Sequence, residues 1–277
     1  MNIDKLIREE LTKRGIDVGI EEVEVIKNAV CCKGIKIINC HSTNICPIVY
    51  YDKNETISAI ADRIAAAVAS NLPAFDIIAV QTKDFFLTNA YISCCKHNGM
   101  TQDIVSKQYL NLDLIIKLHI PLDSDDFCSI SVTKQLLKII GYTIDEAFQI
   151  ASDNSRKTVT IRSMDDILSE PIDTVGTMHV ISCNHGIGGA SAIIFTDVLK
   201  NWCQAHDMTD VYILPSSTEE MILVSDNAIT TSALLKINKN ITSSIVDPIL
   251  ALNPAVYHYS TTNNLVTIAA AEVIDDD

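Results

Sequence analysis

The sequence predicts an α+β fold of mixed, largely antiparallel sheets with packed helices, arranged as two subdomains. Strand-like segments follow one another in groups instead of alternating regularly with helices. Turn-forming residues separate them by a few positions, as in antiparallel hairpins. Amphipathic helical stretches stand between these groups. We expect subdomains over residues 1–95 and 105–272 and an acidic tail over 273–277.

The first subdomain is expected to begin with an amphipathic helix that Gly15 ends. Three short β-branched segments then predict an antiparallel meander, followed by a long helix closed by Pro73 and by a buried strand. The pattern over 85–109 is weak, so the domain boundary is placed there. The expected ranges are 3–14, Glu22–Ile26, Gly34–Asn39, Cys46–Tyr51, Thr56–Leu72 and Asp76–Gln81.

The second subdomain opens with an expected hairpin and two helices, of which the second has a capping box at Thr143 and Glu146. Strands and two more helices follow. The expected strands are Leu112–Ile120, Cys128–Val132, Met178–Cys183, Ser191–Phe195, Val211–Leu214, Met221–Val224, Val256–Tyr259 and Leu265–Ala269, and the expected helices are Thr133–Ile140, Thr143–Asn154, Asp197–His206 and Thr230–Asn240.

Charge and composition limit the classes of partner. The net charge is −14, from 35 acidic and 21 basic residues, and no basic stripe is visible, which argues against nucleic acid. No apolar run approaches the roughly 18 residues of a membrane span, and the N-terminus lacks a signal-peptide core. We therefore expect no membrane partner. Nine cysteines without an export signal predict free thiols in a reducing cytoplasm.

The glycine loop CNHGIGGAS, residues 183–191, is the strongest candidate for a ligand site. Its candidates are His185, Gly186, Gly188 and Gly189, but their spacing completes neither a dinucleotide fingerprint nor a P-loop. The chain also has no GxSxG elbow to make the loop an esterase oxyanion hole. We interpret it as an enlarged hairpin loop before the strand Ser191–Phe195, with His185 exposed at its tip.

Other polar clusters give no complete site. Ser216 and Ser217, in the turn over 215–220, are the remaining ligand-site candidates, although no histidine adjoins them in sequence. The acidic run Asp123–Asp126 lacks the glycine and distal glutamate of a calcium loop. No catalytic set is complete, so the sequence predicts no catalytic residue and no cofactor, and it argues against an enzyme without excluding one.

Two cysteine-rich segments raise the question of a metal site. The first contains Cys31, Cys32, Cys40, His41 and Cys46, and the second contains Cys94, Cys95 and His97. Adjacent cysteines in an extended backbone point to opposite faces, unlike the knuckles of structural zinc sites. We expect buried thiols and no metal, and leave open whether these segments bind one.

Several strings in order resemble a known family: KNAVCCKGIKI…ICPIVYYD, LDLIIKLHI, SISVTKQLLKIIGYTIDEAFQIASDNS, MHVIS…GGASAIIFTDVLKNW and VYILPSSTEEMILV. They are similar to uncharacterised proteins of gut Firmicutes catalogued only as a domain of unknown function, over residues 20–265. A second uncharacterised Firmicutes family resembles the C-terminal half more loosely. Both resemblances imply α+β folds and cytoplasmic bacterial proteins, and neither supplies a catalytic residue.

The chain departs from the first family's pattern at two places. Ala29 begins a stretch, Ala-Val-Cys-Cys, where members show Asn-Gly, and the glycine loop is longer than theirs.

The sequence leaves two hypotheses for the function. The first is a non-enzymatic cytoplasmic module that binds a protein partner, suggested by the acidity and by open strand edges. The alternative is an enzyme or small-ligand binder with its site at 184–191 and 215–220, which requires the two loops to lie together.

Overall fold

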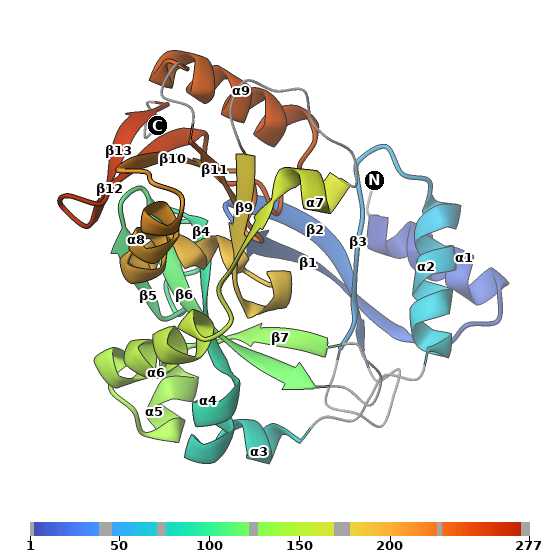
Figure 1. Ribbon diagram of the computed structural model, residues 1–277. Coiled ribbons are helices and arrows are strands. Elements are labelled where there is room, and N and C mark those ends of the chain that lie inside the picture. Colours follow the sequence, from blue (N-terminus) through green and yellow to red (C-terminus); the bar gives the residue numbers. More distant parts are fainter. Residues whose placement is uncertain are drawn as a thin grey trace.

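The computed structural model describes residues 3–38, 46–70, 76–121, 127–168, 178–225 and 229–272. It contains three sheets with helices packed against them, so the chain has an α+β fold (Figure 1). The pairings between the described strands are antiparallel. Within the described ranges, no helix combines the length and the apolar character needed to cross a bilayer.

The N-terminal unit is a three-stranded meander in the order β1-β2-β3, with two helices packed against it (Figure 1). The meander and both helices confirm the expected order of elements. A separate hydrophobic cluster holds the unit together, with Ile7 from the first helix, Ile35 from the second strand and Ile60 from the second helix completely buried. The elements are α1 (Ile3–Lys13), β1 (Gly19–Lys27), β2 (Val30–Ile38), β3 (Ile48–Tyr50) and α2 (Ile57–Ala69).

The second sheet is built around its longest strand, β6. One edge of β6 pairs with β4, and the other pairs with β5 and then β7. Helix α6 has the expected capping box, and Gly141 ends α5 with a left-handed backbone. The elements are α3 (Ile77–Val80), α4 (Lys83–Asn89), β4 (Ala90–Lys96), β5 (Ser106–Tyr109), β6 (Leu112–Pro121), β7 (Phe127–Ser131), α5 (Lys134–Ile140) and α6 (Ile144–Arg156).

The third sheet has six strands in the order β13-β12-β10-β11-β9-β8. The hairpins β10–β11 and β12–β13 were expected, whereas β8 and the short helix α7 were not. The elements are β8 (Thr160–Ser163), α7 (Met164–Leu168), β9 (Met178–Ser182), the 3₁₀ turns η1 (Asn184–Gly186) and η2 (Gly189–Ile194), α8 (Thr196–Ala205), β10 (Asp210–Pro215), β11 (Met221–Val224), α9 (Thr231–Ser244), β12 (Ala255–Ser260) and β13 (Leu265–Ala271).

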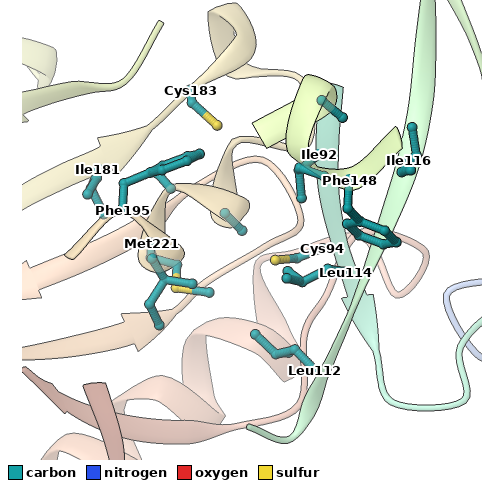
Figure 2. Close-up of a cluster of buried hydrophobic side chains, with 14 of the residues drawn as sticks. Ile92, Cys94, Leu112, Leu114, Ile116, Phe148, Ile181, Cys183, Phe195 and Met221 are labelled. Carbon is teal, nitrogen blue, oxygen red and sulfur yellow. The ribbon is translucent and has the colours of Figure 1, made fainter. Parts of the chain in front are cut away.

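The second and third sheets share one hydrophobic core. Figure 2 shows Phe195 beside Ile181 of the third sheet, and Phe148 of α6 beside Ile116 of the second. Aliphatic side chains from both sheets fill the space between them, as the low aromatic content of 5% requires. Burial of this apolar surface is the main stabilising contribution to the fold.

The two cores separate earlier in the sequence than the expected boundary between residues 95 and 105. The N-terminal cluster ends at Val68, and the shared core begins at Val80. Strand β4 pairs with β6 across the expected boundary. The weak sequence pattern over 85–109 did not indicate α4 and β4, both of which belong to the larger core.

The turn of the β1–β2 hairpin joins the N-terminal unit to the rest of the chain. The side chain of Asn28 is buried there. Its amide nitrogen donates to the carbonyls of Ile249 (2.9 Å) and Ala251 (2.8 Å), and its amide oxygen accepts from the backbone N–H of Lys96 (2.7 Å). One side chain thus satisfies backbone groups of two other segments.

Two expected strands are helical turns in the structure. The expected strand Asp76–Gln81 contains α3 (Ile77–Val80), because the Asp76 carboxylate accepts from the N–H groups of Ile78 and Ala79 and caps the turn. The run Ser191–Phe195 lies mostly in η2, where burial explains its apolar character. A short apolar run does not distinguish a buried helical turn from a strand. The expected turn Asp123–Asp126, Pro73 and the acidic tail 273–277 lie outside the described residues.

Candidate functional site

The glycine loop after β9 curls tightly through a left-handed backbone. Asn184 and His185 have φ of 53° and 57°, and Gly186 and Gly188 have φ of 90° and 65°. Residues other than glycine rarely adopt this conformation, which costs about 1–3 kcal/mol each and is concentrated at functional sites. The loop leads into η2 and α8, so the interpretation as a hairpin between two strands is wrong. His185 is exposed, as expected.

Gly188 and Gly189 are required for close packing of the loop. A Cβ atom at Gly188 would collide with the side chain of Ser93, and one at Gly189 would collide with Ser182 and with the backbone of Glu219. These two glycines are buried, so their role is to let the backbone approach its neighbours. Gly186 has open space around it and is needed only for its positive φ.

The turn over 215–220 lies directly against the glycine loop. The N–H of Gly188 donates to the Glu219 carboxylate (3.2 Å), and the Ser182 hydroxyl donates to the Glu219 carbonyl (2.8 Å). Ser216 and Ser217 are buried, with hydroxyls bonded to the backbone of Glu220 and Glu219 respectively. The structure therefore brings the two candidate loops together, but uses both serines to hold the turn.

A pocket of about 340 Å³ lies on the other flank of the glycine loop. Thr88 and Asn89, at the end of α4, form part of its wall. Ala90 and Tyr91, which begin β4, and His119 on β6 continue this wall. The pocket therefore sits at the end of the second sheet where α4 turns into its edge strand.

Helix α6 and the glycine loop form the opposite side of the pocket. Asn184 is anchored inside the fold, because its side-chain amide donates to the carbonyl of Ile92 (3.0 Å). The next residue, His185, lines the cavity. The residues of this side are Asn154, Lys157, Thr158, Asn184, His185 and Ile187. Four separate stretches of the sequence, 88–91, 119, 154–158 and 184–187, thus converge on one cavity.

Polar side chains seal the edge of β4 beside the pocket. The N–H of Ile92 donates to the Ser155 hydroxyl (2.9 Å), and the Ile92 carbonyl accepts from Ser191 (2.8 Å) as well as from Asn184. The Ala90 carbonyl accepts from Asn154 (3.0 Å). Because buried backbone groups need partners, these side chains replace the missing neighbour strand and fix the pocket wall.

The pocket's ionisable side chains are basic or neutral. Burial, and then the charge of His185, lower the pKa of His119. Burial raises the pKa of Tyr91 to about 12, so this phenol stays protonated. Lys157 is exposed at the rim, and its ammonium lies 3.3 Å from the Asn154 amide oxygen. Among the described residues, none that lines the cavity carries a carboxylate.

Of the residues named individually as ligand-site candidates from the sequence, His185 lines this pocket, and the candidate range 184–191 also contains the lining residues Asn184 and Ile187. Gly186, Gly188, Gly189, Ser216 and Ser217 do not line it. His119 lies in the expected strand Leu112–Ile120, where a core or edge histidine is typical, although its place at the end of the strand was a usable signal. Lys157 carried no such signal in the sequence, because a lysine after an amphipathic helix resembles any surface lysine.

The described cysteines, and the described histidines other than His119 and His185, do not line the pocket. Cys94, Cys95 and Cys183 are buried, and burial raises the pKa of Cys183 to about 11. The described part of the chain contains no group of three side chains placed to hold a metal ion. Cys40 and His41 of the first cysteine-rich segment lie outside the described residues.

A second histidine pair packs around the single tryptophan. The ring of Trp202 on α8 lies 5.0 Å from that of His179 on β9 and 4.8 Å from that of His206, centroid to centroid. Burial is the first cause, and His206 the second, of a lowered pKa at His179. This cluster joins α8 to β9 and has no part in the pocket.

The fold and the pocket define an α+β protein with a small basic cavity between a sheet edge and a strained loop. The chain belongs to DUF5688, a family of unknown function, whose profile matches residues 1–261. The resemblance to a family of unknown function is thereby confirmed. Comparison with curated proteins and with solved structures gives no match.

Proposed function

We propose that the protein binds a small polar molecule in the pocket beside His185. The observation that carries this proposal is the convergence of α4, β4, α6 and the glycine loop on one cavity, with a strained backbone holding His185 at its edge. A volume of about 340 Å³ is near the lower end of ligand pockets, which suits a single metabolite.

Binding without catalysis is the form of this function that the side chains favour. The hydroxyl of Thr88 donates to a backbone carbonyl of α4 at 3.1 Å, and that of Thr158 donates to a backbone carbonyl of α6 at 2.8 Å. The nearby Cys183 is a buried thiol with a raised pKa, which makes it a poor nucleophile. A catalytic pocket would need a nucleophile paired with a base.

Blocking the pocket mouth tests the proposal. Thr88 is exposed on α4 at the rim, so Thr88→Trp should close the opening without entering the core. The control is Leu87→Trp, which adds the same side chain at the preceding, exposed position that does not line the pocket. In ligand-observed NMR with a panel of small metabolites, we expect binding to wild type and to L87W and loss in T88W. Equal binding by both variants would place the ligand elsewhere.

A protein partner is the second candidate, and strand β13 supports it. This seven-residue strand, LVTIAAA, is an edge of the six-stranded sheet and carries no charge. Leu265 and Ile268 are exposed on it, whereas edge strands usually carry charges that prevent pairing. A partner strand could add here, and the unpaired thiols of the described cysteines suit a cytoplasmic setting.

A charged residue on β13 tests this second candidate. Ile268→Lys should abolish capture of a partner that wild-type protein retains in a pull-down analysed by mass spectrometry. If wild type captures no specific partner, or if I268K captures the same one equally well, strand addition at β13 is wrong.

A further inference from the structure

We infer that the ligand of the pocket is an uncharged polyhydroxy compound of about the size of a monosaccharide, and that the Tyr91 hydroxyl binds one of its oxygen atoms. The inference rests on the proposed binding function and specifies the chemistry of the ligand. Three observations carry it: a buried phenol without a partner, open hydrogen-bonding groups in the lining, and charges that disfavour an ion.

Tyr91 lies on the face of the second sheet that is turned away from the shared core. It pairs with Lys117 across β4 and β6, whereas its neighbour Ile92 is completely buried in that core. Because successive side chains of a strand point to opposite faces, Tyr91 shares the outer face with His119, and both line the pocket. Only 5% of the Tyr91 surface is exposed, so the phenol is a built part of the wall.

The Tyr91 hydroxyl is buried and has no hydrogen-bond partner among the described residues. Burial dominates the pKa of Tyr91, and Ser129 on β7 is near enough to affect it, but the two hydroxyls do not meet with hydrogen-bond geometry. Buried polar groups without partners destabilise a fold and are rare in native proteins. A ligand oxygen that accepts from Tyr91 at the wall of the cavity supplies the missing partner.

Three further side chains of the lining have hydrogen-bonding groups that the described fold does not use. Asn89 donates one N–H to the carbonyl of Phe85 (2.9 Å), and its other N–H and its amide oxygen make no bond to a described residue. Asn184 donates one N–H to Ile92 and has a second. The imidazole of His185 makes no hydrogen bond to a described residue. Free donors beside free acceptors fit hydroxyl groups, because a hydroxyl both donates and accepts.

Charges of opposite sign act on the cavity and disfavour a charged ligand. The ammonium of Lys157, exposed at the rim, repels a cation. The pKa of Tyr91 is raised to about 12, mainly by burial and in smaller part by the carboxylate of Glu219, so the negative charge of Glu219 reaches the phenol. An anion bonded to Tyr91 would meet this charge as well as the net charge of −14. An uncharged ligand avoids both costs.

The size of the cavity and the spread of its open groups favour a compact molecule with several hydroxyls. The volume is about 340 Å³. Asn89 ends α4, Tyr91 is on β4 and His185 is on the glycine loop, so polar groups reach the ligand from three separate elements. A monosaccharide or a short polyol presents hydroxyls in several directions, whereas an aliphatic or aromatic compound would leave these groups without partners.

Two substitutions with matched controls test the inference. Tyr91→Phe removes only the hydroxyl, and Tyr109→Phe removes a hydroxyl from a partly buried ring on β5 outside the pocket. Asn89→Ala removes the amide, and Asn240→Ala makes the same change at an exposed position of α9.

The probes are xylitol, myo-inositol and glucose, measured by calorimetry at mildly acidic pH. Gluconate and glucosamine are the charged counterparts of glucose, negative and positive respectively. We expect at least one uncharged compound to bind about tenfold more tightly than both ions. Y91F and N89A should each weaken its binding about tenfold, whereas Y109F and N240A should leave it unchanged.

The stability of ligand-free Y91F separates a binding role from a structural one. Because the hydroxyl has no partner in the described fold, its removal should leave the midpoint of urea unfolding unchanged or raise it. A lowered midpoint would mean that the fold already uses the hydroxyl, and would overturn the inference.

The inference is also overturned if no uncharged polyol binds, if gluconate or glucosamine binds as tightly, if Y91F or N89A binds like wild type, or if Y109F weakens binding as much as Y91F. Binding of other metabolites alone, lost in T88W, would refute the polyol and retain the pocket. Failure of every compound tested to bind in a T88W-sensitive manner would refute both proposals.

Discussion

The charge of the pocket depends on pH through the protonation of His119. Its pKa is lowered first by burial and then by His185. A histidine whose pKa is lower in the folded chain than in the unfolded chain does not destabilise the fold at pH values above the unfolded pKa of about 6.5. As the pH falls from that value toward the folded pKa, the free energy of unfolding decreases. The unfolded chain takes up the proton first.

We expect NMR titration to place the midpoint of His119 below about 6.5. In H185Q the midpoint should rise partway, because the repulsive imidazole is gone while burial, the larger cause, remains. Among the described residues, the other titratable groups that line the cavity with His119 are Tyr91, Lys157 and His185. His206→Gln, outside the pocket, should leave the midpoint unchanged, and a downward or absent shift in H185Q would contradict the proximity of the two rings.

Ala29 stands at a backbone position better suited to glycine. Asn28 and Ala29 are the two central residues of the β1–β2 turn, with φ of 50° and 63°, and Lys27 pairs with Val30. Such two-residue turns favour Asn-Gly. We expect Ala29→Gly to raise the free energy of unfolding by about 0.5 kcal/mol, since relief of strain exceeds the entropy that glycine adds to the unfolded chain.

The same substitution in a helix provides the control for A29G. Ala66 is exposed in the interior of α2, where glycine costs about 1 kcal/mol. Urea unfolding of A29G and Ala66→Gly should therefore give changes of opposite sign. Destabilisation by both would mean that Ala29 contributes contacts that its exposed position does not indicate.

At the level of elements, β4 depends on side chains for its outer edge. The Ile92 N–H has one partner, Ser155, whereas the Ile92 carbonyl has two, Asn184 and Ser191. We expect Ser155→Ala to cost about 1–3 kcal/mol, because a buried N–H loses its partner, and Ser191→Ala to cost less, about 0.5–1.5 kcal/mol. Ser152→Ala, on the same helix as Ser155, is the neutral control in urea unfolding. A larger loss in S191A than in S155A would contradict this assignment.

Elements with caps or hairpin patterns could be predicted from the sequence, and buried short runs could not. Thr143 and Gly141 mark helix ends through local chemistry, so α5 and α6 were predicted closely. The run 191–195 is buried on all sides, so its residues carry no periodicity that separates a 3₁₀ turn from a strand. Asp76 was a cap signal that the apolar residues after it obscured.

The pocket could not be predicted from the sequence because it forms only when distant segments meet. Residues 88–91, 119, 154–158 and 184–187 are separated by up to about a hundred positions, and none of these segments has a motif of its own. The glycines that attracted attention serve packing, as the close approach of Gly188 to Ser93 demonstrates. His185 was identified because it lies beside them.

For the whole molecule, the side chain of Asn28 is a buried polar contact that connects the N-terminal unit to the rest of the chain. Asn28→Asp keeps the acceptor for the Lys96 N–H but turns a carboxylate oxygen toward the carbonyls of Ile249 and Ala251. We expect a loss of about 2 kcal/mol or more near neutral pH in urea unfolding.

Acidification should restore part of the stability of N28D. A carboxyl held against two carbonyls has a raised folded pKa, and its protonated form can donate to one of them. Stability from this group is therefore present at low pH and lost as pH rises through the folded pKa. Asn54→Asp, in an exposed turn, is the control and should change stability by less than about 0.5 kcal/mol. An N28D loss that does not shrink on acidification would contradict the two carbonyl bonds.

The packing of Trp202 against His179 and His206 gives this protein an internal optical reporter. Because the chain has one tryptophan, its intrinsic emission comes from one place, where α8 meets β9. A protonated imidazole in contact with an indole quenches that emission, so the fluorescence of the unlabelled protein follows the charge of these two rings. The same signal records the moment at which α8 leaves the sheet, separately from the N-terminal unit, which has no tryptophan.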